Sequence, residues 1–303
     1  MNKYSVFYYF GRLAYLVIGC VAVILLALPA ALAYPVQVVQ HRIAAGGEES
    51  LLTPVARYTH PSGVTVDLVG AVHLAESGYY RNLNRAFKRY DKVLYEMVDG
   101  EGISEMLRIA RKIEQKTATA EEQQTFERMV EEQNKGGDSA FNNMLSSYYV
   151  LMAQSLKLSL QTECIDYSLD NMVFADVSSE ELAEAMKNRG ESWFGLIAGS
   201  MFQGGSSGGM SSLVSTRKEL RRSFIRGLAK ECSRGSNAME NSAIIITRNE
   251  RCLAVLEREL IPLASGSRVA IFYGAMHLRD MHYRMLERGF SLHGVQWLTA
   301  IRG

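Results

Sequence analysis

Two nearly identical phrases stand 204 residues apart in this chain of 303 residues. The first is an apolar run, 64–69, followed by Gly70-Ala71-Val72-His73-Leu74-Ala75-Glu76. The second is another apolar run, 269–273, followed by Gly274-Ala275-Met276-His277-Leu278-Arg279-Asp280. Each phrase is typical of a buried β-strand, a glycine turn, a histidine and the start of a helix. The pair predicts an α/β fold of two related halves, with each histidine beyond the carboxyl end of a strand, where α/β sheets bind ligands.

The remaining pattern extends this prediction to an α/β fold (α+β being possible) with a central mixed sheet and a long helical insertion at about 102–232. Pro61-Ser62-Gly63 predicts a hairpin turn between β-prone runs at 55–60 and 64–69. Ser77 is expected to cap a helix that runs to about Tyr90, and Ser178, followed three residues later by Glu181, is expected to begin another helix with a capping box. Further strands are expected at 92–98, 268–273 and 291–301. We expect a linker at 35–51 and one folded domain at 52–303.

Composition excludes several classes of protein. Lys and Arg number 33 against 32 Asp and Glu, a net charge of +1, which gives no electrostatic case for nucleic-acid binding. A hydrophobic content of 48% and a charged content of 21% are typical of a folded globular protein. Only 4 cysteines are present, so a disulfide scaffold is excluded, and we expect Cys164, Cys232 and Cys252 to be small buried side chains.

The amino-terminal residues 1–34 carry an export signal of undecided type. Residues 13–33 contain no charge and are long enough to cross a bilayer as a helix. They fit a signal peptide cleaved after Ala31-Leu32-Ala33, and equally an uncleaved anchor whose basic end stays inside. A lipoprotein-like box ending at Cys20 is a third, weaker fit. All three predict a protein that is exported, either membrane-anchored or secreted.

Glu96 closes an otherwise apolar strand, where a buried carboxylate is costly unless a cation balances it. That cation is either an Arg or Lys side chain or a metal ion. We favour the metal, because this strand follows the first histidine phrase by one helix and is expected to lie beside its strand in parallel. Arg248-Asn249 interrupts an apolar helical run; it marks either a helix leaving the core or an arginine that binds substrate or stabilises an oxyanion.

The histidine phrases allow two interpretations. A neutral imidazole is a common metal ligand, and an acid three residues later, Glu76 or Asp280, can ligate the metal or orient the ring. Alternatively, glycine only permits the turn, and the acid only complements the dipole of the following helix. Two such phrases in one chain favour a shared site.

Taken together, these residues resemble the TraB/GumN (TIKI-type) superfamily. The residues that carry the resemblance span 52–301: Gly70, His73, Glu96, Arg248, Asn249, Gly274 and His277, with the phrase Phe174-Ala175-Asp176-Val177-Ser178 matching a family A-D-x-S segment. The family includes metal-dependent proteases and members with regulatory roles, so the resemblance implies a metal site without fixing a substrate. A Gly/Ser-rich stretch at 199–212 departs from the animal proteases.

We therefore predict an exported, peptidase-like metal-dependent hydrolase whose substrate is a peptide or a small molecule. In this hypothesis His73, His277 and Glu96, with Asp280, hold a divalent cation: Mn, Co, Zn or Fe. A carboxylate that is not a ligand, such as Glu76, would be the general base, and Arg248 would stabilise the oxyanion. One alternative is a non-catalytic binding or regulatory protein that sequesters a peptide, a metal or haem; another is a purely structural role for both histidines.

Other motifs carry less weight. Residues 204–208 match G-x-S-x-G, but they lie inside the Gly/Ser stretch and lack the preceding strand that a nucleophile elbow needs. His282 is expected on the surface or behind the ligands, and His41, His60 and His293 have no supporting context.

Overall fold

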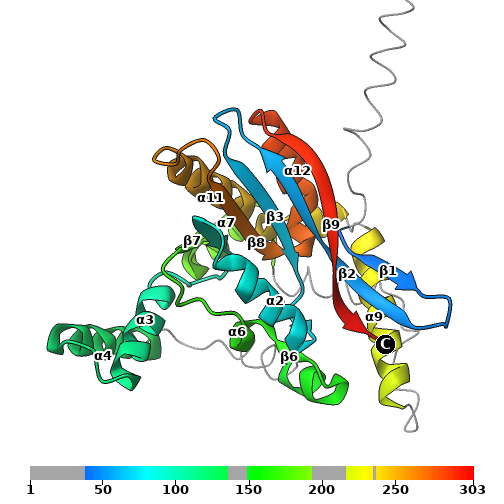
Figure 1. Ribbon diagram of the computed structural model, residues 1–303, viewed down its shortest axis with the longest axis horizontal. Helices are drawn as coiled ribbons and strands as arrows, with labels where there is room; N and C mark the ends of the chain where they lie inside the picture. The colour runs from blue at the N-terminus through cyan, green and yellow to red at the C-terminus, as the bar shows by residue number, and fades with distance from the viewer. Residues whose placement is uncertain (1–37, 136–148, 193–215, 235–236) are drawn as a thin grey trace, which may run out of the picture. The chain divides into compact units, whose positions relative to one another are not determined.

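A seven-stranded mixed sheet organises the part of the chain that the computed structural model describes, residues 38–135, 149–192, 216–234 and 237–303 (Figure 1). The apolar segment 13–33 and the Gly/Ser stretch 199–212 lie outside those residues. Among the described helices, none has the length and apolar character needed to span a membrane.

The sheet has the strand order β1-β2-β3-β8-β5-β7, and β9 pairs with β2. Its strands are β1 (Gln40–Ile43), β2 (Glu49–Thr59), β3 (Thr65–Ala71), β5 (Lys92–Tyr95), β7 (Met172–Phe174), β8 (Arg268–Gly274) and β9 (Ser291–Arg302). A separate pair joins β4 (Leu74–Ala75) to β6 (Ser159–Leu160). The strands β3, β8, β5 and β7 are parallel, whereas β1 and β9 run antiparallel to β2. The α/β fold with a mixed sheet is confirmed.

The helices begin with α2 (Ser77–Phe87), α3 (Ile103–Glu114), α4 (Ala120–Lys135) and α6 (Gln161–Cys164). They continue with α7 (Ser179–Asn188), α9 (Arg217–Arg234), α10 (Asn237–Glu240), α11 (Ala243–Leu260), the short 3-10 helix η1 (Ala275–His277) and α12 (Leu278–Glu287). Helix α2 lies on one face of the sheet, and α11 and α12 lie on the other (Figure 1).

Side-chain alternation explains this layering. On β8, Phe272 packs edge-on against Phe87 of α2, with ring centroids 5.1 Å apart. The next residue, Tyr273, points to the opposite face, where it contacts Cys252 of α11. Successive strand side chains point to opposite faces, so one apolar strand supports helices on both sides.

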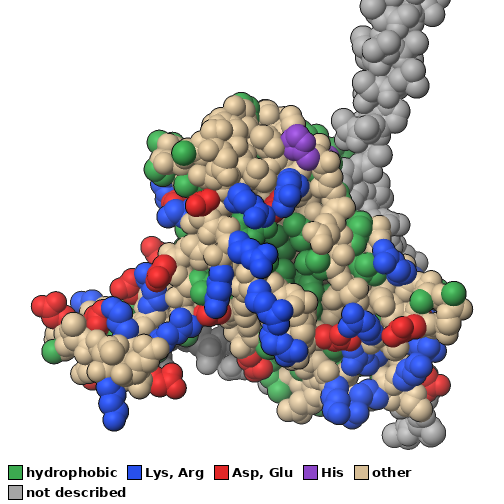
Figure 2. Space-filling model, in the orientation of Figure 1, with side chains coloured by type: hydrophobic (Ala, Val, Ile, Leu, Met, Phe, Trp, Pro, Cys, Tyr) green, Lys and Arg blue, Asp and Glu red, His purple; other side chains and the backbone are tan. Residues whose placement is uncertain are grey.

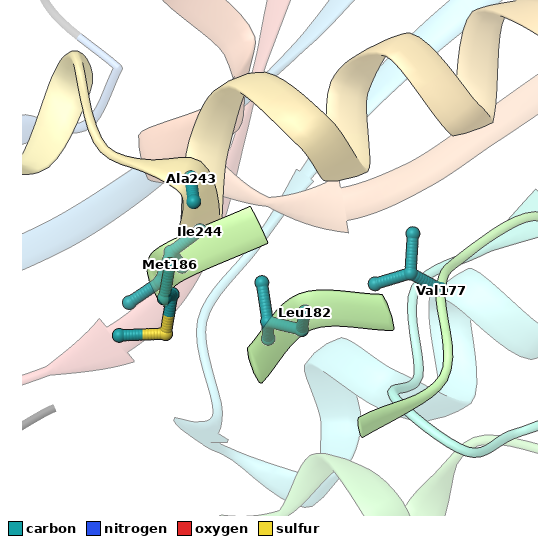
Figure 3. Close-up of a cluster of buried hydrophobic side chains, with 5 residues drawn as sticks. All are labelled: Val177, Leu182, Met186, Ala243 and Ile244. Atoms are coloured by element: carbon teal, nitrogen blue, oxygen red, sulfur yellow. The ribbon is translucent and has the colours of Figure 1, made fainter. Parts of the chain in front are cut away.

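Helix α7 packs against the start of α11 through a small apolar cluster (Figure 3). Its members are Val177, Leu182, Met186, Ala243 and Ile244. At the start of α7, the Ser178 side chain accepts from the backbone of Glu181, and the Glu181 side chain accepts from the backbone of Ser178. The predicted capping box is confirmed, and it fixes the loop immediately after β7.

Several expectations need correction. Residues 35–51 are not only a linker, because they contain β1 and the start of β2. The insertion 102–232 is not wholly helical, since β7 leaves it to join the main sheet. Helix α2 has Glu76, not Ser77, at its N-cap position. Finally, β8 lies between β3 and β5, so the strand before Glu96 is not the direct neighbour of the first histidine strand.

The predicted hairpin of β2 and β3 is confirmed by their antiparallel pairing. Cys232 and Cys252 are buried as expected, whereas Cys164 is only half-buried; all three are free thiols.

Candidate functional site

Four parallel strands deliver polar side chains to one edge of the sheet. His73 follows β3, Glu96 directly follows β5, Asp176 follows β7, and His277 follows β8. These strands are hydrogen-bonded in the order β3-β8-β5-β7, and the carboxyl ends of parallel strands meet at one edge. Pairing places Ala71 opposite Gly274 and Tyr95 opposite Phe272, so these strands end within two residues of one another at this edge.

Glu96 is the centre of the site. Its side chain is only 10% exposed, and its Oε1 lies 2.7 Å from Arg248 Nη2 and 3.5 Å from His277 Nε2. The backbone N–H of Gly274 donates to Oε2. Burial raises the pKa of this carboxyl, but Arg248, His277 and His73 outweigh burial and lower it from 4.5 to about 2. Glu96 is therefore ionised at neutral pH.

Arg248 joins two buried carboxylates. Its Nε and Nη2 donate to the two oxygens of Asp176 at 2.9 and 2.6 Å, in the bidentate geometry that a guanidinium favours. The same Nη2 reaches Glu96. Burial lowers the pKa of Arg248, but Glu96 and Asp176 raise it above its usual value. The sequence left open whether Glu96 meets an arginine or a metal; the structure shows that it meets Arg248.

Asn249 fixes the tautomer of His277. The Asn249 side-chain nitrogen donates to the Asp280 carboxylate at 2.8 Å and to the His277 carbonyl at 3.2 Å, so its oxygen Oδ1 is the acceptor. That oxygen lies 2.7 Å from His277 Nδ1, which must then carry the proton. Burial lowers the pKa of His277 from 6.5 to about 4 although Glu96 opposes this, so the ring is neutral near pH 7. The unprotonated Nε2 thus faces Glu96.

The two motif glycines have different physical roles. A Cβ on Gly274 would lie 3.2 Å from Glu96 Oε2, so glycine allows the carboxylate to approach the backbone of this turn. A Cβ on Gly70 would meet Leu278 at 3.0 Å and Pro54 at 3.1 Å, so glycine there permits packing beneath the site.

The other predicted residues lie at different distances from this centre. His73 is exposed, packs edge-on against Tyr149 with ring centroids 5.6 Å apart, and is near enough to Glu96 to lower its pKa. Asp280 accepts from Asn249 and, at 2.6 Å, from Arg284 Nε.

Glu76, the expected general base, is held instead by an arginine of α9 and by the end of β9. It accepts from Arg221 at 2.9 Å and from the Arg302 side chain at 2.7 Å. His282 is buried rather than on the surface, and its Nδ1 lies 2.8 Å from the Tyr58 hydroxyl.

Within the residues that the structure describes, no three His, Cys, Asp or Glu side chains form a complete metal-ligand cluster. The donor set at the centre still suits a cation in two respects. Glu96 and Asp176 share one guanidinium, so with a neutral His277 this buried group has one negative charge in excess. In addition, an imidazole lone pair faces a carboxylate oxygen across 3.5 Å, and both are acceptors.

Sequence reasoning gave no role to Asp176 and no separate role to Asn249. Asp176 carried the same signal as Glu96, because it directly follows the short apolar run 172–175. Asn249 was visible only as a neighbour of Arg248, and its bond to a histidine 28 residues away could not be read from spacing.

No family model, curated protein or solved structure matched this chain in our comparisons. The resemblance to the TraB/GumN superfamily stays a prediction, and the site must be judged from its own geometry.

Proposed function

We propose that this protein is a hydrolase, acting on peptides, that uses a divalent cation bound by His277 and Glu96 with His73 as a third ligand. The observation that carries the proposal is the unprotonated Nε2 of His277 facing the ionised Glu96 in a buried group of excess negative charge. Members of the TraB/GumN superfamily, which the sequence resembles, include metal-dependent proteases.

The chain's own residues prepare the site. Asn249 holds the proton on Nδ1 of His277 and so directs the Nε2 lone pair toward the centre, as the outer partners of metal-bound histidines do. Asp176 holds Arg248, which is then positioned to balance negative charge that develops on a substrate. A bound divalent cation would lower the pKa of a water molecule and polarise a carbonyl.

The cation can be tested directly on the full chain. The chain is first stripped of metal with a chelator and is then dialysed against Co²⁺, Mn²⁺ or Zn²⁺. We expect about one of these cations per chain by elemental analysis. His277→Ala and Glu96→Gln should abolish binding, and His73→Ala should weaken it. His293→Ala is the matched control, because this histidine is exposed on β9 and away from the site. Unchanged metal content in His277→Ala would reject the site.

Hydrolysis needs a separate measurement. The metal-loaded chain should cleave members of a quenched fluorescent peptide library, and a chelator should stop the cleavage. A fragment beginning at residue 52 is unsuitable, because it would remove β1 and part of β2.

A second candidate function, a binding or regulatory protein, is favoured by one observation. Arg248 already contacts the Glu96 oxygen that faces His277, and the described residues contain no complete ligand cluster. Stoichiometric metal binding with no cleavage of any peptide would support this function over the hydrolase.

We also propose that the folded domain acts outside the cytoplasm, anchored or released through residues 13–33. Protease added to intact cells, after outer-membrane permeabilisation where one is present, should digest the domain. Protection until the inner membrane is broken would contradict export.

A further inference from the structure

A hollow lies on the face of the sheet that carries α2, between that helix and strands β2 and β9. Its volume is about 240 Å³, and its floor is formed by apolar side chains from three strands and the helix: Val55, Val69, Leu83 and Leu298. Figure 2 shows Lys and Arg side chains around a hydrophobic hollow on this face. Apolar pockets with a few convergent polar groups are typical ligand sites.

Asp67 organises the charges at one end of the hollow. This carboxylate is 1% exposed, and Arg57 binds it through Nε and Nη2, both at 2.8 Å. Tyr90 donates to it at 2.7 Å, and Arg268 at 3.3 Å. Burial raises the pKa of Asp67, but Arg57, Tyr90 and Arg268 outweigh burial and lower it. A buried carboxylate therefore holds two guanidinium groups in fixed positions beside the apolar floor.

The hollow has more positive charge than Asp67 requires. Arg57 and Arg268 keep 52% and 39% of their side chains exposed. Arg89, which also lines the hollow, forms no ion pair within the described part of the chain. The lining thus contains three arginines and one aspartate, so it carries two positive charges in excess.

We propose that this hollow binds a small amphipathic anion: a carboxylate or phosphate attached to a compact apolar group. The guanidinium groups match the planar geometry of such an anionic head. The apolar floor would take the body of the ligand, and a shallower hollow continues past Val55 and Arg57 along β9.

This site is independent of the proposed hydrolase. Arg268 is the first residue of β8, whereas His277 lies beyond its last residue. The hollow and the candidate metal site share no residue, so either can fail without the other.

The test uses the full chain and 3-phenylpropionate as the probe, with binding measured by calorimetry. Its neutral amide, 3-phenylpropionamide, reports the apolar contribution alone, and inorganic phosphate reports the charge alone. We expect the carboxylate to bind more tightly than either.

Arg89→Gln should weaken 3-phenylpropionate binding about fivefold, the effect of losing one exposed charged contact. Arg85→Gln is the matched control, since Arg85 lies in the last turn of α2, four residues before Arg89, and does not line the hollow. Ala86→Phe should fill the hollow and abolish binding, with far-UV circular dichroism to show that α2 persists.

Three results would overturn the proposal. They are no binding of 3-phenylpropionate to the wild-type chain, equal affinity for the acid and its amide or for phosphate, and unchanged affinity in Arg89→Gln.

Discussion

Replacing Arg248 with methionine should convert the buried centre of the site from an ion-paired group into two unpaired carboxylates. Arg248 is within 2.9 Å of Asp176 and 2.7 Å of Glu96, and the two carboxylates are 0% and 10% exposed. Removing one partner of a buried ion pair typically costs about 3–5 kcal/mol, because the remaining charge has neither water nor a partner. We expect Arg248→Met to lose about that much stability near neutral pH.

The pH dependence of this loss gives a sharper test. In the wild type, the pKa of Glu96 is about 2 against 4.5 unperturbed, so this group stabilises the fold above the unperturbed value and loses the effect as pH falls toward 2. At about 1.4 kcal/mol per unit, that contribution is about 3 kcal/mol. Without Arg248, burial dominates and raises the pKa of Glu96 above its unfolded value. The variant should then become more stable as pH falls from about 7 to 5, whereas in the wild type Glu96 keeps nearly its full contribution over this range.

The assay is urea unfolding followed by circular dichroism, in a chelator, at both pH values. Arg251→Met is the matched control, because Arg251 lies on the same helix but pairs at the surface with Glu181, 2.5 Å away. Exposed pairs contribute about 0–1 kcal/mol, so this control should change stability little. Glu96→Gln combined with Arg248→Met should recover part of the loss. If Arg248→Met is no less stable than Arg251→Met, or loses equally at both pH values, the reasoning is refuted.

Three further changes test other contacts. Asn249→Leu should cost about 1–3 kcal/mol, because it leaves His277 Nδ1–H without its acceptor and the His277 carbonyl and Asp280 without their donor. ¹⁵N NMR of the wild type should show His277 protonated at Nδ1; protonation at Nε2 would contradict the tautomer. Asp67→Asn should destabilise the fold by about 3 kcal/mol near neutral pH. The lowered pKa of Asp67 stabilises the fold above pH ~4 and stabilises it less at lower pH, so the variant should lose less stability on acidification than the wild type. An unchanged acid-unfolding curve would contradict this. Ser178→Ala should cost about 1 kcal/mol in thermal unfolding by removing the capping bond, while Ser179→Ala, one residue later, serves as the control.

The sequence by itself determined the local helices and strands, and it showed which polar residues lie at the carboxyl ends of the strands. Glycine after an apolar run and a polar residue after a short strand are local signals, because backbone conformation and side-chain burial depend on near neighbours. His73, Glu96 and His277 were therefore placed correctly at strand ends, and the capping box at Ser178 followed from residues three positions apart.

Only the tertiary structure decided which of these residues meet. Strand order is set by packing across the whole sheet, and β8 inserts between β3 and β5 to bring His277, rather than His73, directly to Glu96. Arg248 lies on a helix and Asp176 in the loop after β7, 72 residues away in the sequence, and Glu76 is held by Arg302 near the end of β9. A local sequence pattern can show that a carboxylate is buried and therefore needs a cationic partner. It cannot show which cation this is, because the partner comes from a distant part of the chain.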